Sequence, residues 1–459
     1  MSLSDAQVDE LRNGFRGKVL RADDPGYDDA RTIFNAMIDR RPALIAQCAS
    51  VEDVCAAVEL ARGAGLPTAV RGGGHSVAGK SLCDDGIVID LRHMKAVSVD
   101  PNARTATVGG GATMSDLDRA TEPHGLATTG GRVSTTGVGG FTLGGGAGWL
   151  DRKLGLACDR MLSVELVTAN CRVVKASEDE NPELFWALHG GGGNFGIATS
   201  LEFRLDEVPG VTAALLLWKP EAGPEVLRRY RDFIDSAPDE VGGGMLYMTG
   251  PEEDFVPEEL VDKLVCAVLV TYVGDESEAR EVMSPLLELK PDGEMIASMP
   301  YAELQCMLDD PPGYRNYWSA EYLDDFPDEA VDLFCARARD MIVPSPSQHV
   351  LFPQGGAVGR GNEDIPISWS GASWVVHPFG LWEDPDDDER GRQWAKDIRA
   401  DVKPWATGAT YLNFIGDEGE DRLVAGFGRE NYERLARVKA EYDPDNLFRL
   451  NPNVEPAHA

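Results

Sequence analysis

The stretch that decides the fold is Arg71-Gly72-Gly73-Gly74-His75-Ser76. Three successive glycines let backbone N–H groups approach a phosphate closely, because no Cβ stands in the way. A strand-like apolar segment, residues 66–70, runs into this loop, and a helix-like stretch, residues 51–64, precedes the strand. A histidine at the end of such a loop lies at the edge of whatever the loop holds. The stretch therefore predicts a bound cofactor, with His75 as a candidate for covalent attachment.

Two further glycine clusters follow along the chain. Residues 137–148 contain seven glycines, and Phe141 and Leu143 stand between them. Flexible linkers lack such apolar residues, so this cluster predicts backbone that cradles a cofactor. The third cluster, residues 190–196, precedes a strand rather than a helix, so by itself it is a weak dinucleotide fingerprint. Together the three clusters predict a long cofactor held mainly by main-chain contacts.

The charge balance excludes several classes of partner. The 459 residues include 77 acidic and 43 basic side chains, for a formal net charge of −34. Such a chain repels nucleic acid and anionic lipid, so we expect neither as a partner. The sequence contains no run of about 18 apolar residues, which a membrane-spanning helix would need. The polar N-terminus lacks the pattern of a leader. We expect a cytoplasmic protein, and its acidity fits either ordinary solubility or a salt-rich host.

The cysteine and carboxylate patterns argue against a metal site. The eight cysteines form no Cys-x-x-Cys pair, so we expect them to be reduced and mostly buried. The acidic run at residues 383–389 has consecutive carboxylates with no period that would bring them onto one ion. We interpret it as a solvated loop.

The pattern of elements changes near Pro209-Gly210. Strands and helices alternate over the first 205 residues, whereas longer β-rich segments separated by helices follow. The second part therefore predicts an antiparallel sheet backed by helices. Residues 430–442 form a strongly amphipathic pattern that predicts a helix near the C-terminus.

Six motifs occur in one order over nearly the whole chain: residues 70–76, 137–148, 152–159, 185–196, 411–414 and 442–451. In this set the chain resembles the FAD-linked oxidases of the berberine bridge enzyme type, and it is identified as a bacterial or archaeal member. The resemblance implies an α+β fold of the vanillyl-alcohol-oxidase, or PCMH, type. Its FAD-binding domain would be built from residues 1–208 and 416–459, with a substrate-binding domain, residues 209–415, inserted between them.

The resemblance also implies FAD, bonded at its 8α-methyl group to a ring nitrogen of His75. Many members carry a second attachment cysteine where Val133 stands, so we expect a single covalent bond. We expect Cys158 to pack near the cofactor. The remaining residues expected against FAD are Arg71, Gly72, Gly73, Gly74, Ser76, Ser134, Thr135, Thr136, Gly139, Gly140, Gly144, Asn194, Gly196, Ile197, Asn413 and Asn451.

The family's Tyr-x-Asn motif indicates Tyr411 as the base that takes the substrate proton. We expect Tyr411 and Asn413 to share one face of a strand. A free phenol has a pKa of about 10, so Tyr411 needs a donor or a cation to stabilise its phenolate. Plant members that oxidise alcohols carry Lys and Gln where Val375 and His377 stand. His377 is therefore a second candidate, either as the donor that Tyr411 needs or as the base itself.

We expect Val375, His377 and Phe379 to project toward the flavin, and Gln354 to orient a polar substrate. The resulting prediction is an FAD-dependent oxidoreductase that transfers hydride from a small alcohol or sugar alcohol to flavin N5. Electrons then pass to O₂ or another acceptor, and a Val-sized Thr136 at the family's oxygen gate favours O₂. Two alternatives stay open: an amine substrate, as in similar hydroxynicotine oxidases, and a catalytically silent flavin-binding protein.

Overall fold

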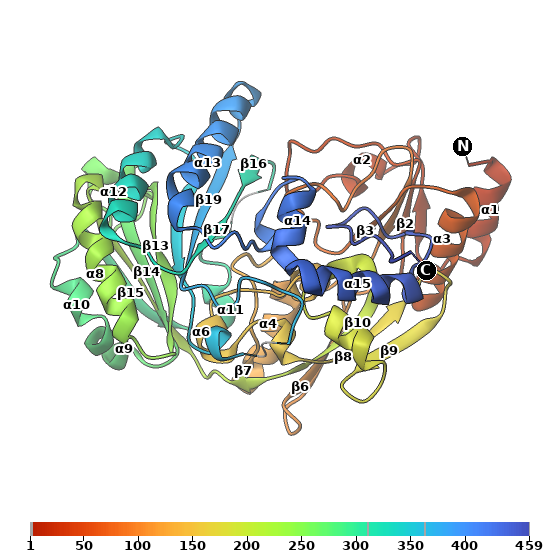
Figure 1. Ribbon diagram of the computed structural model, residues 1–459, viewed down its shortest axis with the longest axis horizontal. Coiled ribbons are helices and arrows are strands. Elements are labelled where there is room, and N and C mark those ends of the chain that lie inside the picture. The colour runs from red at the N-terminus through yellow and green to blue at the C-terminus, as the bar shows by residue number, and fades with distance from the viewer. Residues whose placement is uncertain (1–2, 310–311, 362–363, 459) are drawn as a thin grey trace.

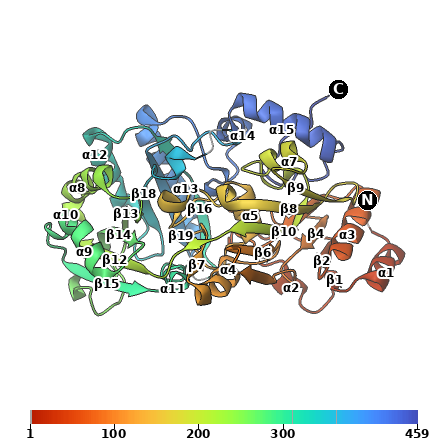
Figure 2. The ribbon, with the colours of Figure 1, turned by 90° about the horizontal axis from the view of Figure 1, so that it is seen from below.

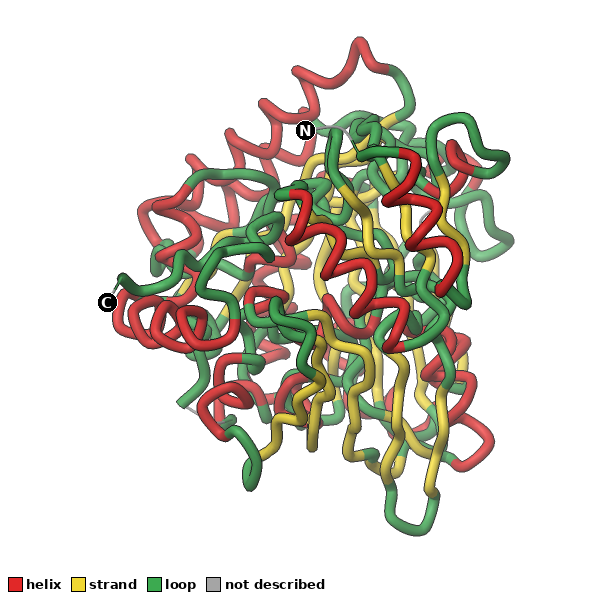
Figure 3. The backbone as a smooth tube through the Cα atoms, turned by 90° about the vertical axis from the view of Figure 1, so that its right-hand side faces the viewer, coloured by secondary structure: helices red, strands yellow, loops and turns green. Residues whose placement is uncertain are grey.

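The computed structural model describes residues 3–309, 312–361 and 364–458. Both chain ends lie together in one lobe, and the middle of the chain forms a second lobe around a large sheet (Figure 1). Seen from the side that carries both termini, the strands form two groups with helices on their outer surface (Figure 3). The observed architecture is the expected α+β arrangement.

The first sheet leads directly into the first glycine loop. Its strands are β1 (Lys18–Leu20), β2 (Leu44–Gln47), β3 (Thr68–Arg71) and β4 (Ile87–Asp90), in the order β1-β2-β4-β3. Strand β4 pairs in parallel with both β2 and β3, whereas β1 is antiparallel to β2. Helix α1 (Asp5–Gly14) precedes β1, and the short helix α2 (Tyr27–Ala30) lies between β1 and β2 in the chain. Because β3 ends at Arg71, the sheet fixes where the glycine loop begins.

Helix α3 (Val51–Ala64) matches its predicted range. The Ser50 hydroxyl caps it by accepting the Asp53 N–H at 3.3 Å, as the sequence pattern indicates. The Asp53 carboxylate does not return the bond to Ser50; it accepts the backbone N–H groups of Arg16, Gly17 and Ala49 instead. Asp53 thus joins the helix to the chain that enters β1.

The second sheet is antiparallel, and the third glycine cluster leads directly into its strand β10. Its order is β5-β6-β10-β8-β9, with β5 (Val97–Asp100), β6 (Thr105–Gly109), β8 (Met161–Val167), β9 (Val173–Ser177) and β10 (Ile197–Arg204). A two-stranded pair, β7 (Leu126–Ala127) and β11 (Asp206–Glu207), lies beside it. Four short helices connect these strands: α4 (Met114–Thr121), α5 (Val138–Leu143), α6 (Asp151–Leu154) and α7 (Pro182–Ala187).

The second lobe is built on an antiparallel sheet in the order β15-β12-β14-β13-β18-β19-β16, with β17 also paired to β19. Its strands are β12 (Val211–Trp218), β13 (Val241–Thr249), β14 (Leu264–Tyr272), β15 (Gly293–Met299), β16 (Arg315–Trp318), β17 (Glu321–Leu323), β18 (Gln348–Pro353) and β19 (Trp374–Trp382). Its helices are α8 (Gly223–Ser236), α9 (Glu276–Val282), α10 (Ser284–Leu287), α11 (Tyr301–Leu304), α12 (Asp328–Arg337) and α13 (Asp388–Val402).

Both faces of this sheet are buried. Along β12, Leu216 packs in a core with helices α8 and α12, whereas Leu215 and Leu217 pack with Trp149 of the first lobe. Helices α8, α12 and α13 cover the outer face (Figure 2). Two buried faces explain why β12 reads as a continuous apolar run rather than an alternating one. The inner face is therefore free to form a wall against the first lobe.

The chain returns to the first lobe through α14 (Glu420–Phe427) and α15 (Arg429–Tyr442). Helix α15 packs beside α7 and buries Leu435, Val438 and Tyr442. The arrangement matches the expected assembly of one lobe from both chain ends, while the domain bounds at 208 and 415 stay predictions. No helix within the described ranges combines the length and the apolar character needed to cross a bilayer.

Candidate active site

A cavity of about 580 Å³ lies where the two lobes meet. The first lobe contributes its three glycine clusters, and the C-terminal tail contributes residues 448–453. The inner face of the large sheet contributes apolar and aromatic side chains, and segment 411–420 closes another side. The cavity thus joins every motif that the sequence singled out except residues 152–159.

The glycine clusters form a wall of bare backbone. A Cβ on Gly73 would lie 2.3 Å from the backbone nitrogen of Gly137, so the first two clusters touch through their main chains. By contrast, a Cβ on Gly140 or Gly193 would meet nothing within 4 Å, and both residues line the cavity. The free space therefore lies directly against peptide groups, as a phosphate-bearing cofactor needs.

The C-terminal tail adds free hydrogen-bond acceptors to this wall. The side-chain oxygens of Asn451 and Asn453 are buried without a partner in the described structure, and both residues line the cavity. Buried polar atoms are nearly always satisfied in a native protein, so these two oxygens indicate donors on a bound molecule. Bare backbone for phosphates and acceptors for amino groups fit the expected FAD.

Asn194 and Lys439 hold the tail in place. The Asn194 amide donates to the carbonyls of Gly191 and Pro452, at 2.7 and 3.0 Å, and accepts the Val454 N–H at 2.9 Å. The buried ammonium group of Lys439 donates to the Asn194 carbonyl at 2.8 Å. Asn194 itself does not line the cavity, so its contribution is to fix the third glycine cluster against the tail.

His75 lines the cavity with one ring nitrogen already engaged. Its Nε2 lies 2.8 Å from the Thr135 hydroxyl, and its ring stacks on Phe34 with 4.3 Å between centroids. Burial, followed by the charge of Arg71, lowers the pKa of His75 to about 4. The imidazole is therefore neutral at pH 7, which leaves a nucleophilic nitrogen lone pair.

Several expected cofactor residues support the wall from behind. Arg71 donates to the carbonyls of Ala30 and Thr32 beneath the loop, and Ser134 donates to the Asp309 carboxylate. Cys158 is fully buried, and burial raises the pKa of its thiol well above the ordinary value. None of these three, nor Thr135, lines the cavity, whereas the following do: Gly72, Gly73, Gly74, Ser76, Thr136, Gly139, Gly140, Gly144, Gly196, Ile197, Asn413 and Asn451.

Tyr411 lines the cavity with its phenol oxygen held by two donors. The Gly146 N–H donates to it at 3.0 Å and the Asn413 amide at 2.9 Å. The same amide nitrogen donates to the Phe141 carbonyl at 3.2 Å, which fixes the orientation of the amide. Two accepted hydrogen bonds favour phenolate, but burial outweighs them and raises the pKa of Tyr411 to about 12.

The predicted strand at residues 411–413 is wrong. Tyr411 has extended backbone but precedes a 3-10 helix, Leu412–Phe414. The tight turn brings the Asn413 amide back onto the Tyr411 phenol. In a strand, residues 411 and 413 would lie about 7 Å apart along the backbone. The two side chains meet, but for a different geometric reason.

His377 lines the cavity from β19, and one of its ring nitrogens donates a hydrogen bond to the backbone. Its Nδ1 lies 2.7 Å from the Ser319 carbonyl, which has no proton to give, so Nδ1 carries the hydrogen. Burial lowers the pKa of His377 to about 4, so the ring is neutral and Nε2 retains its lone pair. The ring stacks on Phe414 with 4.3 Å between centroids. In this tautomer Nε2 carries no hydrogen, so it can accept a hydrogen bond or a proton but cannot act as a donor.

The other expected residues of the large sheet divide in two. Phe379 lines the cavity with His377, whereas Val375 is buried in the neighbouring core. Gln354 is also buried and does not line the cavity; its carbonyl accepts an N–H of Arg152 at 2.7 Å. Gln354 is therefore not placed to contact a substrate in the cavity, contrary to the expectation that it orients one.

Sequence reasoning missed the apolar character of the sheet wall. Besides Phe379, which was expected there, Trp318, Phe352, Leu246 and Leu269 line the cavity, so little of this wall forms hydrogen bonds. It also missed Arg132, whose guanidinium lies 4.1 Å from the centroid of the Phe352 ring. Only its place beside Val133 pointed to Arg132, while the aromatic residues become neighbours through sheet pairing that no local pattern reveals.

The described residues contain no group of three or more His, Cys, Asp or Glu side chains arranged to hold a metal ion. The acidic run is partly structured: Asp384 caps a short 3-10 helix, and Asp388 accepts two hydrogen bonds from Arg315 at the start of α13.

Comparison with known proteins finds two family matches. Residues 42–177 match the FAD binding domain family, and residues 410–455 match the family described as berberine and berberine like. These matches cover the first two glycine clusters and the Tyr-x-Asn motif.

Two curated relatives are similar over nearly their whole length. The (R)-6-hydroxynicotine oxidase of Paenarthrobacter nicotinovorans is 31% identical, with 96% of this chain and 97% of the relative covered. The FAD-linked oxidoreductase pgmH of Aspergillus terreus is also 31% identical, with 97% and 95% covered. The crystal structure of 6-hydroxy-D-nicotine oxidase from Arthrobacter nicotinovorans superimposes with a TM-score of 0.85 at 28% identity, covering 96% of this chain and 98% of that one.

Proposed function

Because the chain belongs to the FAD-linked oxidoreductases of the berberine bridge enzyme type, we propose that it oxidises a small alcohol or sugar alcohol. The observation that carries this proposal is the phenol of Tyr411, held by two N–H donors in the cavity wall. An alcohol must lose its hydroxyl proton as its carbon is oxidised, and Tyr411 is the group placed to take it.

We propose that His75 holds FAD through one covalent bond. The neutral imidazole, anchored at Nε2 by Thr135, leaves Nδ1 as the free ring nitrogen. Val133 offers no thiol for a second bond, and the buried Cys158 does not reach the cavity. FAD, when bound, supplies the two-electron acceptor for the reaction.

The chain's own residues then divide the remaining work. Gly146 and Asn413 stabilise negative charge on the Tyr411 oxygen, and His377 offers Nε2 as an acceptor for a donor on the substrate. The apolar wall around Phe352 and Phe379 excludes water from the reacting centre. Thr136, compact and cavity-lining, supports O₂ as the final electron acceptor.

A second candidate substrate is an amine, which two observations favour. The pKa of Tyr411 is raised to about 12, and the described contacts of its phenol include no cation. A neutral amine needs no strong base for its oxidation, unlike an alcohol. The acidic protein and the aromatic wall also attract the cationic form of an amine, which must release its proton before it is oxidised.

Anaerobic mixing of the FAD-loaded protein with a panel of small alcohols, sugar alcohols and amines tests this proposal. Bleaching of the flavin absorbance by an alcohol is the expected result. With Tyr411→Phe, alcohol-driven bleaching should slow by about 10²–10⁴, the usual worth of acid–base catalysis, whereas amine-driven bleaching should change far less. Bleaching by amines alone would select the second candidate, and no bleaching by any class would indicate a silent flavin-binding protein.

A further inference from the structure

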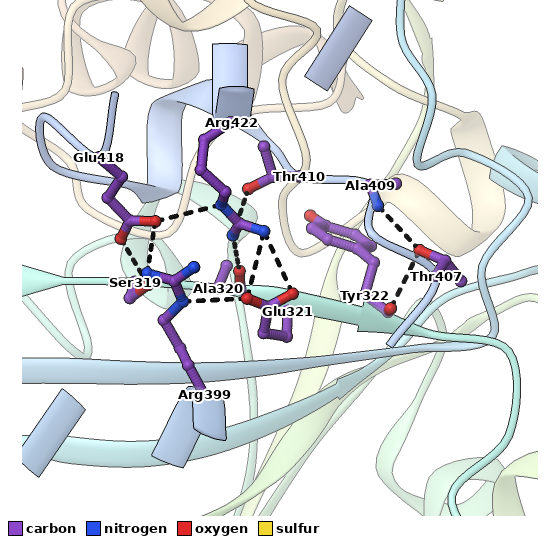
Figure 4. A network of polar contacts seen from close by, with 10 residues as sticks. All are labelled: Ser319, Ala320, Glu321, Tyr322, Arg399, Thr407, Ala409, Thr410, Glu418 and Arg422. Atoms are coloured by element: carbon purple, nitrogen blue, oxygen red, sulfur yellow. Dashed lines mark hydrogen bonds and ion pairs between the residues drawn. The ribbon is translucent and has the colours of Figure 1, made fainter. Parts of the chain in front are cut away.

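Four charged side chains close a ring beside the cavity (Figure 4). Arg399 contacts Glu321 at 2.9 Å and Glu418 at 2.8 Å, and Arg422 contacts the same two carboxylates at 3.2 Å each. The ring joins β17, α13, α14 and the loop before α14. The Glu321 and Glu418 side chains are only 8% and 4% exposed, so this is a buried cluster rather than a surface ion pair.

One branch of the ring leads to His377. Ser319 donates its hydroxyl to Glu418 at 2.7 Å, and the carbonyl of the same residue accepts Nδ1–H of His377 at 2.7 Å. Because a carbonyl only accepts, this contact fixes the tautomer and aims Nε2 away from Ser319. Strand β17 also pairs Glu321 with Val376, the residue before His377. The ring therefore helps to hold two pieces of backbone around His377: the Ser319 carbonyl that accepts its Nδ1–H, and strand β17, which pairs beside it.

The other branch leads to Tyr411. Arg422 donates to the Ala320 carbonyl at 2.7 Å and to the Thr410 hydroxyl at 3.1 Å, directly before Tyr411. Farther back, the Thr407 hydroxyl donates to the Tyr322 carbonyl at 3.1 Å, which ties the same loop to the same strand (Figure 4). The two candidate proton-handling groups come from different segments, and the ring bonds to a neighbour of each: Ser319, which holds His377, and Thr410, which precedes Tyr411.

The simplest alternative is that the ring only stabilises the fold. Buried ion pairs cost desolvation energy, and replacing them by packed apolar groups is often neutral or stabilising, so stability alone is a weak reason for four buried charges. We propose that the Glu321–Arg399–Glu418–Arg422 ring is a positioning device: it fixes the neutral tautomer of His377 and its orientation relative to Tyr411. This inference rests on the proposed function only for its kinetic consequence.

Three variants of the flavin-loaded protein test it. Glu418→Ala opens the ring and removes the acceptor of Ser319, whereas Glu418→Gln keeps an oxygen for Ser319. Asp388→Ala is the matched control, because it removes a carboxylate from another half-buried pair, with Arg315 at 2.6 Å, that does not line the cavity. Ser319→Ala removes the hydroxyl link alone and serves if Glu418→Ala does not fold.

Long-range ¹⁵N NMR of the seven histidines reads the tautomer directly, with His377→Asn assigning the signal. We expect a pure Nδ1–H tautomer in the wild type, Glu418→Gln and Asp388→Ala, and a mixture in Glu418→Ala and Ser319→Ala. An unchanged His377 signal in both alanine variants would overturn the proposal. This readout needs no substrate, so it decides the positioning role even if no alcohol or amine bleaches the flavin.

With a reacting substrate, kcat of Glu418→Ala should fall by about 10- to 100-fold with little change in KM, since small misplacements of reacting groups cost this much. Glu418→Gln should recover most of that loss, and Asp388→Ala should leave kcat near the wild-type value. Equal losses in Glu418→Ala and Asp388→Ala would indicate a merely structural cluster and contradict the proposal.

Discussion

The amide nitrogen of Asn413 lies 2.9 Å from the phenol oxygen of Tyr411, two residues away, and it donates to that oxygen. The contact lowers the pKa of Tyr411, although burial keeps the net pKa at about 12. This hydrogen bond matters most when Tyr411 is ionised, because a hydrogen bond to a charged group such as phenolate contributes about 1.5–3 kcal/mol.

Asn413→Ala should therefore raise the pKa of Tyr411 further. If phenolate is the base, kcat/KM for an alcohol rises with pH, and the variant's rising limb moves to higher pH. At a fixed pH near 8, the variant should be slower by about 10- to 100-fold. The pH profile of kcat/KM measures this. Adding Asn413→Ala to Tyr411→Phe should cause almost no further loss, and a full additional loss would show that Asn413 acts independently of Tyr411.

His75→Ala should abolish covalent flavin, seen as loss of fluorescence from the protein band in a denaturing gel. Cys158→Ala should leave that fluorescence intact, because the buried thiol does not line the cavity. The pKa of His75 is about 4, so its attacking nitrogen is already deprotonated across the neutral range. Flavin attachment to the apoprotein should therefore proceed at a similar rate between about pH 6 and 8. Fluorescence that survives in His75→Ala would refute the assignment.

Two glycines of the second cluster should respond to substitution in opposite ways. A Cβ on Gly140 meets no atom within 4 Å, so Gly140→Ala should fold and gain up to about 1 kcal/mol of stability from its helical position. A larger side chain in Gly140→Leu should block FAD, measured as loss of bound flavin at an unchanged melting temperature of the apoprotein.

Gly137→Ala, by contrast, places its Cβ 2.3 Å from the Gly73 nitrogen and should lower the melting temperature itself. Normal flavin content in Gly140→Leu would contradict the placement of the cofactor along this wall.

Asp118 and Asp116 in helix α4 should change stability with opposite pH dependence. Asp118 is buried, and burial raises its pKa well above the usual range, although Gln305 opposes the shift. A raised folded-state pKa means that its contribution is favourable in acid and is lost as the pH rises through the folded pKa. Asp118→Asn should therefore stabilise the protein at pH 7, with the gain vanishing below about pH 4.

Asp116 is the matched control in the same helix. Burial opposes its ionisation, but hydrogen bonds from Thr113 lower its net pKa. Its stabilisation is present above the unfolded pKa and lost as the pH falls, so Asp116→Asn should destabilise at pH 7 and less in acid. Thermal unfolding across a pH series measures the stability of both variants. If their melting temperatures changed with pH in the same direction relative to the wild type, the opposite pKa shifts of Asp118 and Asp116 would be refuted.

The net charge of −34 should make stability depend on salt. Carboxylate repulsion is strongest when the Debye length is long, about 10 Å at 0.1 M salt, and weakens as salt is added. The melting temperature should rise between about 0.1 and 2 M KCl. Chloride is the appropriate anion, because sulfate stabilises proteins by exclusion from their surfaces. A melting temperature that is flat or falls over this range would show that the acidity carries no salt requirement.

Local patterns predicted the elements that depend on local physics. The cap at Ser50 and the Gly65 that ends α3 (φ 62°) set that helix within the chain itself, so its range was predictable. Strand β13 has no local strand signal near its start, because residues 242–244 are three consecutive glycines; pairing with β14 along its whole length holds it extended. Helix α13 begins inside the acidic run that was expected to be a solvated loop, and its first residue, Asp388, accepts two hydrogen bonds from Arg315.

The sequence by itself determined the cofactor wall, because glycine's freedom from a Cβ is a property of the residue and needs no neighbour. It also supplied His75, Tyr411 and His377 as candidates from residue type and motif. The tertiary structure alone decided their chemical states: that Tyr411 accepts two hydrogen bonds, that His377 donates from Nδ1 and leaves Nε2 as an acceptor, and that Gln354 lies outside the cavity. The protonation state and the hydrogen-bonding role of a side chain depend on its burial and its partners, and partners such as Gly146 for Tyr411 and Ser319 for His377 come from other segments that only folding brings near.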